Sequence, residues 1–221
     1  NKSKRRRHVF KTGRFTGGSM IIIVPCAGRS SRYPAMRPKW MLTQPGGELM
    51  VRESVRGLHL RDRDRLIVTI LESHEKRYHV VKGLKASFDR KIDVCVLEKQ
   101  TGSQPETIYR TLIQERIPLD SPVLIKDSDN YFELEDIEQS DSYVAVNSLN
   151  EHNAINPRNK SYVQVNENGI VQQIVEKQVV SDLFCVGGYF FKTAKQFISG
   201  YKALRPKDRK ELYISDVIGG L

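Results

Sequence analysis

Short apolar runs alternate with helical patterns along the first half of this chain of 221 residues. The apolar runs cover residues 21–26, 65–71, 92–97 and 122–126, and the helical patterns cover residues 48–58, 76–88 and 106–116. A strand, a helix and a second strand form a right-handed parallel unit. Repetition of this unit predicts an α/β, Rossmann-like sheet wrapped by helices, with ligands bound at the edge where the parallel strands end.

The second half of the chain has a different pattern. Strand signals cover residues 142–146, 161–165, 170–176 and 184–191, and helical patterns cover residues 193–201 and 210–218. The sequence Asn-Glu-Asn-Gly at 166–169 is typical of a hairpin turn. We therefore expect an antiparallel extension of the sheet on the side where a second substrate would bind.

Positive charge is concentrated at the amino end. Residues 1–19 hold seven Lys and Arg and no acid, and thus most of the formal net charge of +10. The length predicts a single domain, which we place at residues 20–221 behind a basic, flexible leader at 1–19. The leader could bind nucleic acid or an anionic surface, or it could be an upstream extension before Met20. Nucleic acid is otherwise not expected as a partner.

Three cysteines, Cys26, Cys95 and Cys185, lie in apolar runs without a paired motif. This pattern favours reduced core thiols in a cytoplasmic protein over disulfides or zinc ligands. No apolar run approaches the roughly 20 residues of a membrane span, so we expect no membrane partner. The sequence does not indicate the oligomeric state.

The first apolar run ends at a glycine followed by cations. After Gly28 come Arg29, Arg32, Arg37 and Lys39. A glycine allows backbone N–H groups to approach a polyanion, and the cations can neutralise it. The loop matches neither the dinucleotide fingerprint nor the P-loop. It favours phosphate binding, with an ordinary strand-to-loop junction and solvated cations as the alternative.

Two carboxylates follow the fourth strand. Asp127 and Asp129 are two residues apart, so in an extended backbone they would point the same way. Two hard oxygen ligands facing a cationic phosphate loop would suit Mg²⁺ bridging nucleotide phosphates. The alternative is that Asp-Ser-Asp-Asn at 127–130 only forms a turn.

These loops together resemble the sugar-phosphate nucleotidyltransferases. Residues 27–32 (Ala-Gly-Arg-Ser-Ser-Arg) and Pro38-Lys39 resemble the A-G-x-G-T-R and P-K signature of that family. Asp129 resembles its metal-binding aspartate, with Asp127 as a helper. Four other passages also resemble the family: Gly102 to Thr107, Glu176-Lys177, Gly187-Gly188, and the helix start at 211–218. Along the chain, all these motifs follow one another in family order.

The resemblance implies transfer of a nucleotide from an NTP to a sugar 1-phosphate with release of pyrophosphate, for polysaccharide or cell-surface glycan precursors. It implies Mg²⁺ as cofactor, held by Asp127 and Asp129. It further implies residue roles. Arg32 and Lys39 would act on the reacting phosphates. The residues that contact the nucleotide would be Ala27, Gly28, Arg29, Ser30, Ser31, Gly102, Ser103 and Thr107. The residues that contact the acceptor would be Glu176, Lys177, Gly187 and Gly188. Residues 102–107 alone could equally be a helix amino terminus.

The chain departs from the family pattern in three places. Ser30 replaces the usual second glycine, and the stretch from Arg32 to Lys39 is shorter than in most sugar enzymes. The chain also stops at Leu221, where the family continues toward a second metal ligand, so we expect the domain to be incomplete at that end. These departures leave the base and the acceptor class open.

Three rival functions stay open. A CTP-dependent cytidylyltransferase could use phosphocholine or another non-sugar phosphate. A glycosyltransferase with a D-x-D metal site could share the sheet but would lack the loop from Gly28 to Lys39. A nucleic-acid binder could use the basic leader, although the rest of the chain shows no aromatic-rich basic strand or recognition helix.

Overall fold

The structure is a computed structural model that describes residues 18–28, 36–134, 141–151, 156–204 and 212–219. Its strands are β1 (Ile21–Pro25), β2 (Arg65–Leu71), β3 (Asp93–Leu97), β4 (Val123–Lys126), β5 (Tyr143–Ser148), β6 (Ser161–Val165), β7 (Val171–Glu176) and β8 (Leu183–Phe191). Its α-helices are α1 (Met50–Arg56), α2 (Glu72–Tyr78), α3 (Val80–Ala86), α4 (Gln104–Gln114), α5 (Ala194–Ala203) and α6 (Ile214–Gly219). Short 3₁₀ helices cover Lys39–Met41 (η1), Leu149–Glu151 (η2) and Pro157–Asn159 (η3).

The described strands form one sheet, and its first half is parallel. β3, β2, β1 and β4 lie in this order, and each neighbouring pair is parallel. Ile23 in β1 pairs with Ile67 in β2 and with Ile125 in β4. The predicted α/β, Rossmann-like fold is therefore confirmed.

Helices cover both faces of the parallel half, because alternate residues of a strand point to opposite faces. Ile21 and Ile23 of β1 belong to one apolar cluster, to which α4, α5 and α6 contribute. Ile22 and Val24 belong to a second cluster, to which α1 and α3 contribute. This double burial explains why β1 reads as an uninterrupted apolar run.

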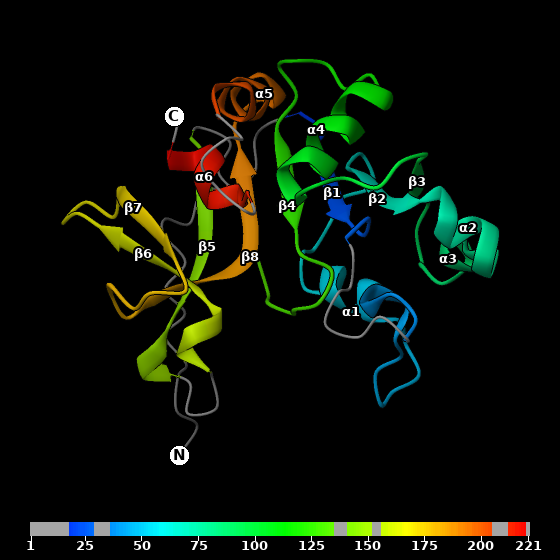
Figure 1. The fold of residues 1–221 in the computed structure, drawn as a ribbon, viewed down its shortest axis with the longest axis horizontal. Coiled ribbons are helices and arrows are strands. Elements are labelled where there is room, and N and C mark those ends of the chain that lie inside the picture. The colour runs from blue at the N-terminus through cyan, green and yellow to red at the C-terminus, as the bar shows by residue number, and fades with distance from the viewer. Residues whose placement is uncertain (1–17, 29–35, 135–140, 152–155, 205–211, 220–221) are drawn as a thin grey trace.

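The second half of the sheet is antiparallel, as predicted. β8 pairs with β4 on one side and with β5 and β6 on the other, and β7 pairs with β6. Figure 1 shows β8 between the parallel strands and the strands β5 to β7, and its arrow opposes that of β4. The hairpin at 166–169 is also confirmed, since the N–H of Asn166 donates to the carbonyl of Ile170 at 2.9 Å.

One helix prediction was wrong. The pattern at 76–88 predicted a single helix, whereas the structure has α2 and α3 with a break at His79. His79 adopts a left-handed backbone with φ of 49°, which ends α2. The carboxylate of Glu75 accepts a hydrogen bond from the N–H of Val81 at 2.8 Å, so the chain restarts as a new helix.

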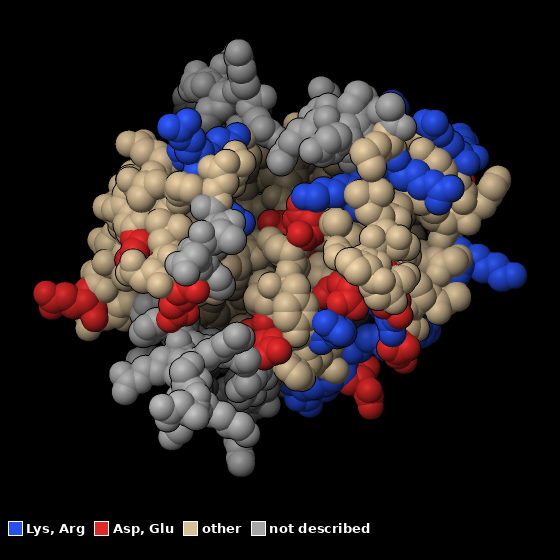
Figure 2. Space-filling view, turned by 90° about the horizontal axis from the view of Figure 1, so that it is seen from below, with Lys and Arg blue, Asp and Glu red and all other residues tan. Residues whose placement is uncertain are grey.

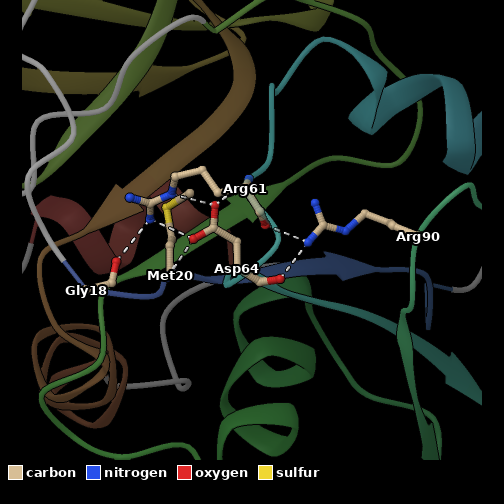
Figure 3. A network of polar contacts seen from close by, with 5 residues as sticks. All are labelled: Gly18, Met20, Arg61, Asp64 and Arg90. Carbon is tan, nitrogen blue, oxygen red and sulfur yellow. Dashed lines mark hydrogen bonds and ion pairs between the residues drawn. The ribbon is translucent and has the colours of Figure 1, made fainter.

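A buried polar network holds the amino ends of β1 and β2 together (Figure 3). The carboxylate of Asp64 accepts hydrogen bonds from Arg61 at 2.7 Å and from the N–H of Met20 at 3.0 Å. Arg61 also donates to the carbonyl of Gly18, and Arg90 donates to the carbonyls of Arg61 and Asp64. Burial raises the pKa of Asp64, but the hydrogen bonds from Arg61 and Met20 to its carboxylate and the charge of Arg61 outweigh this, and the pKa lies below its usual value.

The cysteines and the helices bear on two further predictions. Cys26, Cys95 and Cys185 are buried and free, which confirms the prediction of core thiols. Within the described ranges, no helix has both the length and the apolar character that a bilayer crossing requires.

Candidate active site

The carboxyl ends of β1 and β4 lie side by side, because the two strands are parallel and in register from Ile21 to Ile23. The loops that follow them therefore start at the same edge of the sheet. Figure 2 looks onto the molecule from this side and shows acidic and basic side chains close together near the middle of the face. Cys26 lies within reach of Ser128 and Asp129, so the two loops are in contact.

An ion pair joins these two loops. Nζ of Lys39, at the start of η1, lies 2.5 Å from Oδ2 of Asp129. Both side chains stay accessible, with 50% of Lys39 and 37% of Asp129 exposed. The structure thus brings together a cation and a carboxylate that are 90 residues apart in sequence. An exposed pair of this kind contributes little to stability, so its position at the ligand edge is its main significance.

Asp127 has a different environment from Asp129. Its Oδ1 accepts a hydrogen bond from Nε2 of Gln104, at the start of α4, at 2.5 Å. Burial raises the pKa of Asp127 to about 6, the hydrogen bond from Gln104 opposes this shift, and the negative charges of Asp129 and Glu176 add to it. The Asp127 carboxylate is therefore hydrogen-bonded to the start of α4 and interacts electrostatically with Glu176 at the end of β7.

The backbone around these acids is not extended. Ser128 and Asp129 form a turn, so the expectation that both carboxylates point the same way along an extended strand was wrong. The carbonyls of this segment turn toward Lys126 instead of continuing β4: its buried ammonium donates to those of Asp127 and Asn130 at 2.8 Å each. Burial lowers the pKa of Lys126 to about 8, although the carboxylates of Asp127 and Asp129 oppose this.

The two acids fit a magnesium site by the chemistry of their oxygens. Mg²⁺ is commonly bound by one or two carboxylates together with substrate phosphates. Asp127 and Asp129 supply two carboxylates beside a cation-bearing loop. In the part of the chain that the structure describes, no cluster of three or more His, Cys, Asp or Glu residues could hold a metal by itself. A metal here would therefore need phosphate or water oxygens to complete its coordination.

The predicted phosphate loop is described only at its two ends. Ala27 is buried, while Gly28 is exposed and has no atom within 4 Å of where a side chain would begin. Arg29, Ser30, Ser31 and Arg32 lie outside the described residues. The nucleotide-binding role of these residues stays a prediction. Lys39, at the far end of the loop, is described, and it is the residue that pairs with Asp129.

The residues predicted to read the base lie at the amino end of α4. Ser103 caps the helix by accepting a hydrogen bond from the N–H of Glu106 at 3.3 Å. The N–H of exposed Gly102 donates to the Glu106 carboxylate at 2.7 Å. Thr107 is buried, and its hydroxyl lies 2.6 Å from that of Thr101. Contact of Thr107 with a base stays a prediction, and its observed partners are those of a residue that supports the loop.

The residues predicted to bind the acceptor lie on β7 and β8. One Glu176 oxygen accepts hydrogen bonds from the hydroxyls of Ser161 at 2.7 Å and Ser215 at 2.6 Å. Lys177 is exposed, has a left-handed backbone with φ of 59°, and its Nζ donates to the hydroxyl of Tyr213 at 2.9 Å. Glu176 thus ties β6, β7 and α6 together, and Lys177 presents its ammonium beside Tyr213.

The two glycines of β8 lie directly against the aspartate turn. A Cβ on Gly187 would lie 2.5 Å from Oδ2 of Asp127 and 2.4 Å from Nδ2 of Asn130. A Cβ on Gly188 would lie 2.5 Å from the Phe132 ring. The structure therefore places these glycines beside the candidate metal site.

Sequence reasoning missed two residues that shape the site. Lys126 ends β4 and is fully buried, although lysine is rarely buried. The sequence signal that could have identified it was a lysine at the end of an otherwise apolar inner strand. Tyr213 lies within the passage at 211–218 that resembles the family, but that resemblance gave it no role, because its contact with Lys177 depends on where α6 packs.

Comparisons with known proteins agree on the architecture. No protein-family model and no curated protein matches the sequence. A nucleoside-diphosphate-sugar pyrophosphorylase from Vibrio cholerae RC9 has a similar structure, with a TM-score of 0.69 and 21% identity over 91% of this chain and 86% of that one. The inositol-1-phosphate CTP transferase from T. maritima is also similar, with a TM-score of 0.67 and 16% identity over 92% of this chain and 81% of that one.

A third similar structure, from Bacillus anthracis, is assigned as a glucose-1-phosphate thymidylyltransferase. Its TM-score is 0.66, with 21% identity over 91% of this chain and 81% of that one. The three neighbours share one architecture across most of the length of this chain. The chain therefore has the Rossmann-like fold of solved sugar-phosphate nucleotidyltransferases.

Proposed function

We propose that this chain is a metal-dependent nucleotidyltransferase that joins a nucleotide from an NTP to a sugar 1-phosphate and releases pyrophosphate. The observation that carries the proposal is the ion pair between Lys39 and Asp129 at 2.5 Å. It brings the last cation of the predicted phosphate loop next to the acid that follows β4, at the edge where ligands bind in such sheets. The fold supports the same function.

The reaction forms a bond between an acceptor phosphate oxygen and the α-phosphorus of the NTP. The bond from the α-phosphorus to the oxygen that bridges to the β-phosphate breaks, and pyrophosphate leaves with that oxygen. Such a transfer needs positioning and neutralisation of charge more than covalent help from the protein. An ammonium that faces the reacting phosphates supplies part of that neutralisation, and we assign this role to Lys39.

Asp127 and Asp129 would hold Mg²⁺, which when bound neutralises charge on the nucleotide phosphates. Asp129 is the more accessible ligand, because 37% of its side chain is exposed. Asp127 is held in place by Gln104, so it would act as the fixed member of the pair. Arg32 of the same cation-rich loop would hold the outer phosphates.

The acceptor would bind beside β8, on the side of the end of β7 and the start of α6. Lys177 presents an exposed ammonium to this side, held by Tyr213 at 2.9 Å. Gly187 and Gly188 let β8 pack directly against the aspartate turn, which keeps the acids close to this side of the sheet. In this proposal the activated product serves as a precursor for polysaccharides or cell-surface glycans.

The experiment is a substrate panel read as pyrophosphate release with Mg²⁺ present. Each of four NTPs is combined with sugar 1-phosphates, inositol 1-phosphate and phosphocholine, so that the panel also identifies the base and the acceptor class. We expect one combination with a sugar 1-phosphate to turn over. Activity only with a non-sugar phosphate would replace the acceptor assignment, and no pyrophosphate from any combination would contradict the proposal.

Two matched variants link any activity to the site. Asp129→Asn removes the exposed carboxylate, and Asp120→Asn makes the same change in the loop before β4, at the opposite edge of the sheet. We expect Asp129→Asn to lose at least about 100-fold in turnover while it melts close to the parent, since one well-placed charge is worth roughly 3 kcal/mol in the transition state. Asp120→Asn should keep the activity of the parent.

A further inference from the structure

Lys126 is the fully buried lysine at the end of β4. β4 is an inner strand, with β1 on one side and β8 on the other. A buried ammonium is costly unless its donors are satisfied, and a strand in this position is normally apolar throughout. A lysine at this place therefore needs a specific reason.

Every donor of the Lys126 ammonium has a partner in the turn that follows it. An ammonium has three N–H groups. They reach the carbonyl of Asp127 at 2.8 Å, the carbonyl of Asn130 at 2.8 Å and Oδ1 of Asn130 at 2.5 Å. The ring of Phe132 lies over the same ammonium, with its centre 4.6 Å from Nζ. Residues 127–130 therefore wrap around one buried charge.

The outside of this turn rests on β8. The N–H of Asp127 donates to the carbonyl of Gly187 at 2.8 Å. Side-chain atoms of Asp127 and Asn130 come so close to Gly187 that a Cβ there would lie within 2.8 Å of them. The turn is thus clamped between the ammonium of Lys126 on its inner side and bare backbone on its outer side.

This clamp determines where the two acids point. Both peptide carbonyls that Lys126 holds belong to residues that flank Asp129 in the turn, at positions 127 and 130. With these carbonyls drawn inward, Asp129 lies at the exposed tip and reaches Lys39. Asp127 instead points toward Gln104 and accepts its hydrogen bond.

We propose that Lys126 is a positioning residue that shapes the turn at 127–130 and thereby sets the affinity of Asp127 and Asp129 for a divalent cation. The inference rests on the proposed function, because it takes these acids as the metal ligands. Lys126 does not touch substrate in this scheme. Groups that orient metal ligands typically contribute 10- to 100-fold to metal affinity.

The test measures Mn²⁺ binding directly, by the loss of the electron paramagnetic resonance signal of free Mn²⁺. Lys126→Met keeps an unbranched side chain that is only one heavy atom shorter, and it removes the charge and the donors. We expect it to bind Mn²⁺ at least about tenfold more weakly than the parent. With saturating metal, turnover should stay within about threefold of the parent, because the ligands themselves are intact.

Two further variants keep the test decisive. Asn130→Ala removes one of the three acceptors of Lys126 and should also weaken Mn²⁺ binding. If Lys126→Met does not fold, Asn130→Ala tests the inference in its place. Asp64→Asn breaks the buried network at the opposite edge of the sheet and controls for lost stability. Its Mn²⁺ affinity should equal that of the parent.

The outcomes separate the inference from the function on which it rests. Unchanged Mn²⁺ affinity in both Lys126→Met and Asn130→Ala would overturn the inference and leave the proposed function standing. An equal loss in Asp64→Asn would also overturn it, because the effect would then be general destabilisation. A parent that binds no Mn²⁺, or binds it equally after Asp129→Asn, would overturn the metal site of the proposed function and the inference with it.

Discussion

Replacement of Gly187 by alanine tests the packing of β8 against the aspartate turn. Gly187 has φ of 78°, a left-handed backbone that residues with a Cβ adopt at a cost of roughly 1–2 kcal/mol. The new Cβ would lie 2.4 Å from Nδ2 of Asn130 and 2.5 Å from Oδ2 of Asp127. Real Cβ atoms do not approach other heavy atoms so closely, so the turn or the strand has to move.

The expected loss of stability follows from these two terms. Overpacking of a close contact costs typically about 1–3 kcal/mol. Together with the backbone term, Gly187→Ala should lose at least about 2 kcal/mol of unfolding free energy. For a chain of this size each kcal/mol shifts the melting temperature by about 2–4 °C. We therefore expect a melting temperature lower by about 4 °C or more.

Urea unfolding and thermal melting of Gly187→Ala measure this loss. Gly46→Ala is the matched control, because no atom lies within 4 Å of its added Cβ and its backbone is not left-handed. It should stay within about 0.5 kcal/mol of the parent. If Gly187→Ala unfolds at the same urea concentration as the parent, the close approach of β8 to the turn is refuted.

Three other changes probe separate features. Lys39→Ala should lower turnover about 100-fold, with exposed Lys195→Ala on α5 as a control, and activity within threefold of the parent would contradict the role of Lys39. Gly83→Ala in the interior of α3, where the added Cβ meets no atom within 4 Å, should raise stability by roughly 0.5–1 kcal/mol in urea unfolding; a lower stability would show that α3 is packed differently. Asp64→Asn should lose about 1–3 kcal/mol at pH 7. The pKa of Asp64 is lowered in the folded state, so its stabilisation is present at neutral pH and decreases as the pH falls through that lowered pKa; a difference from the parent that does not shrink as the pH is lowered from neutral into the acid range would contradict this.

The local pattern of the sequence was sufficient to predict the strands and most helices. The boundaries predicted for residues 65–71 and 161–165 are those of β2 and β6. These runs are apolar or alternating over a length that suits a strand, and turn residues bound them. The same reasoning failed at His79, because its left-handed backbone depends on the contact between Glu75 and Val81 and has no sequence signal such as a glycine.

The sequence alone also identified Asp127, Asp129 and Lys39 as candidate residues, since acids and cations after strands of a parallel sheet must face one edge. It determined by itself the parallel half, the antiparallel extension and the chemistry available at the carboxyl ends of β1 and β4. Only the tertiary structure decided that β8 lies beside β4, that Lys126 is buried beneath the aspartate turn and that Gln104 reaches Asp127. For two of these features the physical reason is distance along the chain: β4 and β8 come from segments more than 60 residues apart, and Gln104 lies 23 residues before Asp127, so no local periodicity encodes their contacts. Lys126 contacts residues next to it in sequence, but its burial depends on the packing of β4 between β1 and β8.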